Sequence, residues 1–460
     1  MSINTSRTGK IRLIFLPFLG LALWTDPDFV KKLNVRKNLQ KRGKSSIISN
    51  IPEKWEDKYQ WEEKHMNKKS ILSIVLAAML VLVLVLTAGC QKQDKPADKA
   101  EENVIRIGVF EPSTGDNGAG GKQEILGMQY ALTKTPTVEI GGETYKVELV
   151  YADNASSNDK APSAAQTLIS GGVSVVLGSY GSGVSIAAGD TFSAAKVPAI
   201  GVTCTNPQVT SGCDVYYRIC FLDPFQGTVL ANFAKANGAT KAYCLAKQGD
   251  DYSGGLCNYF IEAFGADNCV YEQFPADTSD FSTYVTNAQN QGCNVFFAPV
   301  STEAAAQIIK KASAQSLGMP ILAGDTWDSN VILEAAKGSD LDINVTTFYQ
   351  EGANPEFDNG IKAWINSDAT AKSNNGGNDE LAAVTAMGYD AYYVALEAVK
   401  KAGTTDPAKV LEVLPSLEYT GVTGAIAFDE IGDAKRDSAF VKKCNTTTGV
   451  WDFVTEAKAQ

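Results

Sequence analysis

Histidine is almost missing from this chain. The 460 residues include one histidine, His65, and residues 90–460 contain none. Catalysis by a Ser-His-Asp or Cys-His arrangement needs an imidazole, and histidine is also the commonest transition-metal ligand in proteins. No Cys-x-x-Cys pair occurs, so the spacing typical of zinc sites is absent too. We therefore expect no catalytic residue, no cofactor and no metal.

Phosphate-binding loops are also lacking. The Gly-rich segment Pro112–Lys122 contains Gly-Gly-Lys, but Asp116 occupies the position where a P-loop needs glycine, and Gln123 replaces its Ser/Thr. The segment does not supply the GxGxxG of a dinucleotide loop. We interpret it as a flexible turn that allows close backbone approach.

Basic residues become scarce after residue 89. Residues 90–460 hold 26 Lys/Arg against 45 Asp/Glu, a net charge of −19, whereas residues 1–89 carry +8. Nucleic-acid phosphates require neutralisation by Lys and Arg. The charge balance therefore argues against a nucleic-acid partner.

One apolar run, Ile71–Leu86, divides the chain. The basic segment Met66–Ser70 precedes it and the small residues Thr87–Cys90 follow, as in a secretory signal with its cleavage site. The string resembles a lipobox with Cys90 as the lipidated residue, although Thr87 stands where leucine is usual. We assign residues 66–89 to a lipoprotein signal peptide and 90–103 to a flexible tether; a transmembrane anchor is the alternative.

Residues 1–65 do not fit a signal at an N-terminus. We expect Met66 to be the true start and 1–65 to be upstream sequence, with an unusually long leader as the alternative. The mature chain would then lie outside the cytoplasm, anchored by lipid to the outer face of the cell membrane. Eight cysteines follow Cys90, and an oxidising compartment favours disulfides, whereas an anaerobe's envelope leaves thiols reduced. Cys204 and Cys213 are the pair most favoured by their separation.

The part after residue 103 alternates short β-rich runs with helical runs, which predicts parallel sheets wound on both faces. Its length, 371 residues from Cys90, suits two lobes. The predicted strands are Val104–Phe110, Lys146–Ala152, Val173–Gly178, Ala199–Val202, Lys241–Ala246, Val270–Phe274, Asn294–Pro299, Ile321–Gly324 and Val345–Tyr349. The clearest predicted helices are Ala161–Ile169, Phe225–Ala236, Thr302–Gln315 and Ala382–Ala402.

Ligands of open α/β sheets bind beyond the carboxyl ends of the strands. Ser182 opens a helix after one strand and suits a carboxylate, although a simple helix cap is the alternative. Later strands are followed by a carboxylate and an aromatic, Asp325 and Trp327, which suit a cation and an apolar wall, or else a surface turn. This division predicts a zwitterion, with its carboxylate in one lobe and its ammonium in the other. The candidate binding residues are Ser182, Thr203, Thr205, Tyr252, Ser301, Asp325 and Trp327.

Several segments resemble the branched-chain amino acid binding proteins of the type I periplasmic binding protein superfamily. The resemblance runs from about Val104 to Phe453 and lies in Ile105–Gly115, Glu124–Ala131, Gly388–Tyr393, Tyr419–Gly424 and Phe428–Asp433. It implies two Rossmann-like, doubly wound α/β lobes joined by a three-segment hinge. Lobe 1 would comprise 104–221 and 347–428, and lobe 2 would comprise 222–346 and 429–460. The crossings are expected near Ile219–Asp223, Asn344–Phe348 and Phe428–Asp433.

The resemblance also implies roles for individual residues. Ser182 and Thr205 fall on positions that bind the ligand carboxylate, and Thr203 on one whose backbone carbonyl meets the ammonium. Asp325 matches the acidic residue that pairs with the ammonium, and Tyr252 matches a tyrosine of the same lobe. Ser301 falls where a pocket aromatic is frequent. Gly120 stands where an aromatic often covers the ligand, which puts specificity for leucine-like side chains in doubt.

We therefore expect a monomeric solute-binding lipoprotein that captures an amino acid by lobe closure and delivers it to the permease of an ABC transporter. A ligand-sensing receptor domain is one alternative, and a neighbouring permease and ATPase gene set would discriminate against it. An amide- or ester-processing enzyme on the same fold is the other, since a fold does not determine function.

Overall fold

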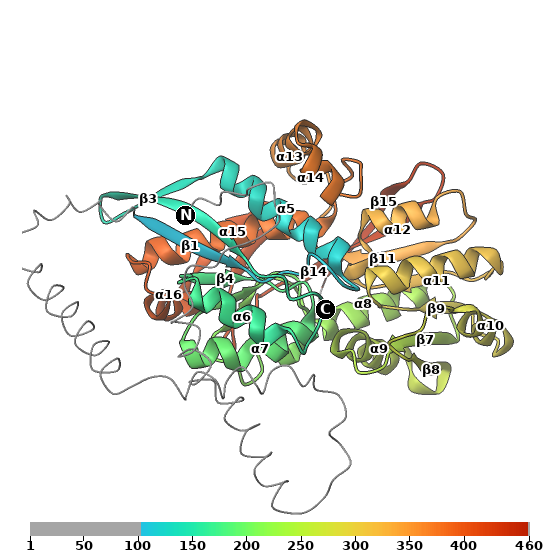
Figure 1. Ribbon diagram of the computed structural model, residues 1–460. Coiled ribbons are helices and arrows are strands. Elements are labelled where there is room, and N and C mark those ends of the chain that lie inside the picture. Colours follow the sequence, from blue (N-terminus) through green and yellow to red (C-terminus); the bar gives the residue numbers. More distant parts are fainter. Residues whose placement is uncertain (1–102, 459–460) are drawn as a thin grey trace, which may run out of the picture. The chain divides into compact units, whose positions relative to one another are not determined.

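Two open β-sheets organise residues 103–458, the part of the chain that the computed structural model describes (Figure 1). The segments predicted as signal peptide and, apart from residue 103, as tether lie outside these residues, as does Cys90. Among the described residues, no helix is both long and apolar enough to cross a membrane.

The first sheet has the strand order β2-β3-β1-β4-β5-β6, and all its pairs except β2–β3 are parallel. Its central strands are continuous apolar runs buried on both faces, as expected where helices cover each side. The strands are β1 (Val104–Val109), β2 (Thr137–Ile140), β3 (Glu143–Tyr151), β4 (Val175–Leu177), β5 (Ala199–Gly201) and β6 (Tyr216–Arg218).

Helices α5 (Gly118–Lys134) and α15 (Ala383–Ala402) cover one face of this sheet, and α6 (Ala161–Ser170) and α7 (Ser182–Ala195) cover the other (Figure 1). Glycines allow α5 and α15 to touch, because a Cβ on Gly127 would lie 1.9 Å from Thr385 O and one on Gly388 2.1 Å from Glu124 O. The predicted turn at Pro112–Lys122 is therefore only partly right: α5 already begins at Gly118, and its glycines permit close packing.

The second sheet has the order β15-β14-β11-β10-β9-β7-β8. Helices α8 (Asp223–Ala236) and α9 (Asp251–Phe264) cover one face, and α10 (Ser282–Asn290), α11 (Thr302–Ala314) and α12 (Asn330–Ala336) the other. The strands are β7 (Ala242–Lys247), β8 (Cys269–Phe274), β9 (Val295–Phe297), β10 (Ile321–Ala323), β11 (Ile343–Thr347), β14 (Ser438–Asn445) and β15 (Val450–Lys458).

The remaining elements lie between β11 and β14 in the sequence and pack largely on the α15 side of the first sheet. They are α13 (Pro355–Ser367), α14 (Ala369–Asn374), α16 (Pro407–Val413) and the hairpin β12 (Glu418–Gly421) and β13 (Gly424–Ala427). Short 3-10 helices occur at η3 (Pro207–Val209), η4 (Ala266–Asn268), η5 (Asp325–Trp327) and η6 (Leu414–Ser416).

The chain passes between the two sheets at 219–222, 348–354 and 428–437. The predicted fold class, two α/β lobes joined by three segments, is confirmed. The predicted crossing at Asn344–Phe348 is displaced, because 343–347 form strand β11 in the middle of the second sheet.

Candidate functional site

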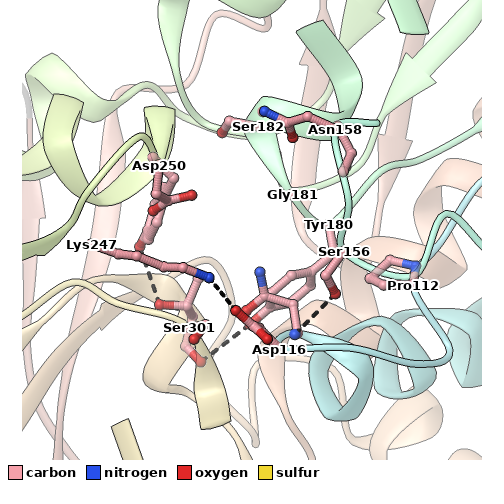
Figure 2. Close-up of a pocket in the computed structure, with 15 residues that line it drawn as sticks. Pro112, Asp116, Ser156, Asn158, Tyr180, Gly181, Ser182, Lys247, Asp250 and Ser301 are labelled. Atoms are coloured by element: carbon pink, nitrogen blue, oxygen red, sulfur yellow. Dashed lines mark hydrogen bonds and ion pairs between the residues drawn. The ribbon is translucent and has the colours of Figure 1, made fainter. Parts of the chain in front are cut away.

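Three of the seven sequence-predicted residues, Ser182, Tyr252 and Ser301, line one cavity between the two lobes, at the carboxyl ends of β4, β7, β9 and β10 (Figure 2). Asp325 does not line it and lies behind Tyr252, to which it is hydrogen-bonded. The cavity has a volume of about 50 Å³. Parallel strands bring the loops that follow them to the same edge of a sheet, which is why these distant segments meet. The lining residues are Pro112, Asp116, Asn117, Ser156, Asn158, Tyr180, Gly181, Ser182, Gly183, Val184, Lys247, Asp250, Tyr252, Ser301 and Thr326.

Ser182 is the first residue of α7 and is 1% exposed. The cap of this helix is Gly181, and no side chain caps its first turn, so the alternative that Ser182 caps the helix is wrong. The Ser182 hydroxyl instead accepts a hydrogen bond from Asn206 N at 3.2 Å. The first turn therefore presents Gly181–Val184 to the cavity, and backbone N–H groups at a helix start favour an anion.

Thr203 and Thr205 follow β5 and are buried, but neither lines the cavity. Thr203 Oγ1 donates to Glu124 Oε1 at 2.9 Å. Thr205 Oγ1 has no hydrogen-bond partner, nor do the carboxyl oxygens of buried Asp223. Burial raises the pKa of the Asp223 carboxyl, and the nearby Thr205 hydroxyl opposes this rise. Both threonines thus lie behind the cavity wall rather than on it.

Asp325 opens η5 directly after β10 and is 1% exposed. Its Oδ1 accepts hydrogen bonds from Gln226 Nε2 at 2.8 Å and from Tyr252 Oη at 2.9 Å. Burial raises its pKa to about 6, and the two hydrogen bonds oppose the shift. A cation beside this carboxylate would recover the energy that burial costs it.

Ser301 lies at the cavity as predicted and has a second role as a helix cap, whereas Trp327 does not lie at the cavity. Ser301 lines the cavity, and its hydroxyl also caps α11 by accepting from Ala304 N at 3.5 Å. Trp327 is fully buried in the hydrophobic core of the second lobe and does not line the cavity. The apolar wall predicted there is therefore wrong, as is the surface turn, because the one-turn helix η5 directs the indole into the core.

Two buried glutamates behind the cavity were not predicted as site residues. Glu111 Oε2 accepts from Tyr180 N at 2.6 Å, and Glu124 accepts from Thr203. Burial raises the pKa of Glu124 to about 8. Burial and the neighbouring Glu124 carboxyl raise the pKa of Glu111 well above its usual value. Glu124 lies within a helical pattern, where a carboxyl looks like a surface group, so its only signal was the neighbouring apolar residues on α5. Glu111 follows the end of β1, so its place after a strand was the signal that could have found it.

Lys247 and Asp116 were missed as well. Their side chains form an ion pair across the cavity between the two lobes (Figure 2). The Asp116 backbone carbonyl also accepts from Thr302 Oγ1 at 3.1 Å and from Glu303 N at 3.2 Å, both at the start of α11. With the Tyr180 Oη–Thr326 O bond of 3.2 Å, these contacts hold the lobes against each other in a closed arrangement.

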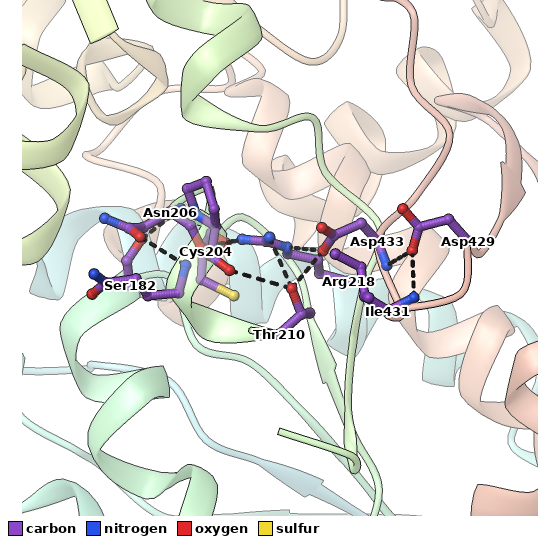
Figure 3. Close-up of polar contacts among 10 residues, drawn as sticks. Ser182, Cys204, Asn206, Thr210, Arg218, Asp429, Ile431 and Asp433 are labelled. Carbon is purple, nitrogen blue, oxygen red and sulfur yellow. Dashed lines mark hydrogen bonds and ion pairs between the residues drawn. The ribbon is translucent and has the colours of Figure 1, made fainter. Parts of the chain in front are cut away.

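A buried arginine supports the loop after β5 (Figure 3). Arg218 is 0% exposed; its Nε donates to Asp433 Oδ1 at 2.6 Å, and its Nη1 to the backbone carbonyls of Cys204 (2.9 Å) and Asn206. Its Nη2 donates to Thr210 Oγ1 at 3.1 Å. The guanidinium therefore joins the loop that carries Thr203–Asn206 to the third connection between the lobes.

The expected Cys204–Cys213 disulfide is not formed. Each of the eight cysteines within residues 103–458 is a free thiol. Cys204 is buried in the core, where burial raises its pKa to about 11, whereas Cys213 lies against α7 with its Sγ 3.7 Å from Ser193 Oγ. The loop between the two cysteines thus directs their side chains to different surroundings.

The fold and this cavity define a two-lobed solute-binding protein. A family model described as periplasmic binding protein matches residues 104–446, and the chain belongs to that family. It is a solute-binding family rather than an enzyme family.

Similar proteins agree with this assignment. The chain is 26% identical over 338 residues to Leu/Ile/Val-binding protein homolog 1 of Brucella melitensis, covering 72% of this chain and 88% of that one. It is 31% identical to the crystal structure of a leucine binding protein, LivK, of Thermotoga maritima, with a TM-score of 0.68 over 77% of this chain and 99% of that one. A solute binding protein of an ABC transporter from Rhodopseudomonas palustris, in complex with p-hydroxybenzoic acid, shares the fold at 20% identity, with a TM-score of 0.65 over 78% and 98% of the two chains.

Proposed function

We propose that this chain is the extracytoplasmic solute-binding component of an ABC transporter, and that it captures an amino acid between its lobes and delivers it to a permease. The observation that carries the proposal is the opposite polarity of the two lobes around the cavity, with Asp325 directly behind the lining residue Tyr252. The open first turn of α7 with Ser182 lies in one lobe, and the buried carboxylate of Asp325, held by Tyr252 and Gln226, lies in the other. An α-amino acid carries the two complementary charges on adjacent groups.

Each group of the ligand has a proposed partner. The α-carboxylate would meet the N–H groups of the first turn of α7 and the Ser182 hydroxyl, with Thr205 behind them. The α-ammonium would meet Asp325, with the Thr203 backbone carbonyl as a second acceptor. Tyr252 donates to Asp325 and orients that carboxylate. Ser301 lines the cavity and would contact the ligand side chain.

Transport further implies that the protein is held near a permease. We propose that Cys90 is lipidated after cleavage of a signal at 66–89, that 90–103 tethers the binding domain to the membrane, and that the protein acts as a monomer. The lobes would comprise 104–221 with 347–428, and 222–346 with 429–460, closing by a hinge motion.

A thermal-shift screen of the twenty amino acids tests the ligand class. A ligand at about 100-fold excess over its Kd stabilises the folded state by about 2.7 kcal/mol. We expect at least one amino acid to raise the melting temperature, and hydroxybenzoates to leave it unchanged. A shift from hydroxybenzoates alone would contradict the proposal and assign aromatic carboxylates instead.

A further inference from the structure

The ring of Tyr180 occupies the centre of the site. Tyr180 follows β4, is 3% exposed and lines the cavity (Figure 2). A Cβ built on Gly120 would lie 2.4 Å from its Cζ and 2.6 Å from its hydroxyl oxygen. Gly120 lies inside α5 with a φ outside the left-handed region, so its backbone does not require glycine. Glycine in a helix interior is unfavourable compared with alanine. The reason for glycine here is the space that the Tyr180 ring takes.

The ring is held from both lobes. Glu111 Oε2 in the first lobe accepts from Tyr180 N at 2.6 Å, and the hydroxyl donates to Thr326 O in the second lobe at 3.2 Å. Thr326 is the residue after Asp325, so the ring lies beside the proposed ammonium site. To vacate this position, Tyr180 must leave Gly120 and give up a buried hydrogen bond.

Little room remains beside the ring. The cavity volume of about 50 Å³ is on the order of the space that a few water molecules occupy. Sites for drug-sized ligands are usually about 300–1,000 Å³. The remaining space suits an amino-acid head group with a side chain of very few atoms.

The lining is also unsuited to a branched apolar side chain. Its aliphatic side chains are Pro112 and Val184, whereas its neutral polar side chains include Asn117, Ser156, Asn158 and Ser301. An isobutyl group placed here would displace water from hydroxyl and amide groups without supplying hydrogen bonds, which is unfavourable. A small hydroxyl or methyl side chain avoids that loss.

We infer that Tyr180, packed on Gly120, is a specificity-determining residue that restricts this site to amino acids with small side chains, of the size of glycine, alanine or serine. The inference rests on the proposed function. A larger amino acid can enter only by displacing the ring. In a binding pocket, a difference of one methylene between two ligands changes the ratio of their affinities by roughly 10- to 200-fold. The Tyr180 ring excludes more than one methylene, so it is sufficient to set a preference for small side chains.

Calorimetric titration with glycine, alanine, serine, valine and leucine tests this inference. Wild type should bind at least one of the three small ligands at least tenfold more tightly than leucine. Tyr180→Ala should improve leucine binding at least tenfold relative to alanine. Tyr180→Phe is the matched control: it keeps the ring, loses only the bond to Thr326, and should keep the wild-type order. Gly120→Ala, which forces the ring to move, should weaken the small ligands.

The possible failures are distinguishable. Leucine preferred by wild type, or an unchanged order in a Tyr180→Ala protein that is folded by circular dichroism, would overturn the size restriction and leave amino-acid binding intact. If Tyr180→Ala does not fold, Tyr180→Val, which fills part of the buried space but is much smaller than the ring, takes its place with the same expectation and the same contradicting result. If none of the five ligands binds but the screen of the twenty amino acids finds a larger one that does, the size restriction is overturned and amino-acid capture stands. If no amino acid binds, the proposed function is overturned together with this inference.

Discussion

Replacing Asp325 by asparagine should change stability and binding in opposite directions. Asparagine keeps the shape of the side chain, and its Oδ1 can still accept from Gln226 and Tyr252, so the hydrogen bonds that position residue 325 remain. What disappears is a carboxylate that is 1% exposed and whose pKa burial raises from 3.8 to about 6. This burial makes the variant informative.

The magnitude follows from linkage. A folded-state pKa above the unfolded value means that the folded protein binds the proton more tightly, so stability falls as pH rises through the interval from 3.8 to about 6. The shift of about two pKa units corresponds to about 3 kcal/mol of destabilisation at neutral pH. Ligand-free Asp325→Asn should therefore be more stable than wild type by up to about 3 kcal/mol near pH 7, and the difference should vanish near pH 4.

Binding should respond in the other direction. Leaving a buried ammonium unpaired costs roughly 3–5 kcal/mol, which is about a hundredfold to several-thousandfold in affinity. Wild-type affinity should also fall as pH decreases through about 6, because the ligand ammonium favours the charged carboxylate. Affinity of Asp325→Asn should show no such fall.

Urea denaturation of the two ligand-free proteins at both pH values, with calorimetric titration of the best amino acid from the screen, measures both effects. A variant that is less stable than wild type near pH 7, or stabilised equally near pH 4, would refute the electrostatic reasoning. Unchanged affinity would refute the assignment of the ammonium site.

Three further predictions concern the rest of the chain. Arg218→Met should lower the free energy of unfolding, measured by urea titration, by roughly 3–5 kcal/mol, because it leaves the carboxylate of Asp433 buried and without its ion-pair partner. An unchanged free energy of unfolding would show that the Arg218–Asp433 ion pair does not stabilise the fold. Alkylation of the native protein should modify half-buried Cys213 and spare buried Cys204, whose pKa is about 11, and peptide mapping that finds the two joined would contradict the structure. Cys90→Ser should be released or left with its signal uncleaved, and a fatty acid still attached to that variant, measured by mass spectrometry, would exclude lipidation at Cys90.

Burial on both faces made the central strands predictable. Runs such as Val175–Leu177 and Ile321–Ala323 are continuously apolar because helices cover each side. The strands β14 and β15 were missed because they form an antiparallel hairpin at the sheet edge, where Lys443 and Asp452 face each other in register and much of β15 is exposed. These two strands have neither a continuous apolar run nor a regular alternation of apolar and polar residues, which are the sequence signals of a strand.

The sequence predicted those residues of the candidate site that directly follow the carboxyl ends of the strands. That rule located Ser182, Tyr252 and Ser301, which line the cavity, because each comes within a few residues of a strand's carboxyl end. It also located Asp325, which lies behind Tyr252. The rule gives no side-chain direction, so it could not tell that Trp327 enters the core or that Tyr180 enters the cavity. Those directions are set by packing between segments far apart in the sequence, as the contact of Tyr180 with Gly120 illustrates.

The most direct test of amino-acid capture is the identity of the ligand that the protein carries. Wild type and Asp325→Asn would be purified in parallel without denaturation and then unfolded, and the small molecules released would be identified and quantified by mass spectrometry. We expect a small amino acid, released from wild type in stoichiometric amount and absent from Asp325→Asn. An aromatic carboxylate from wild type, or the same amino acid in equal amount from both proteins, would contradict this expectation.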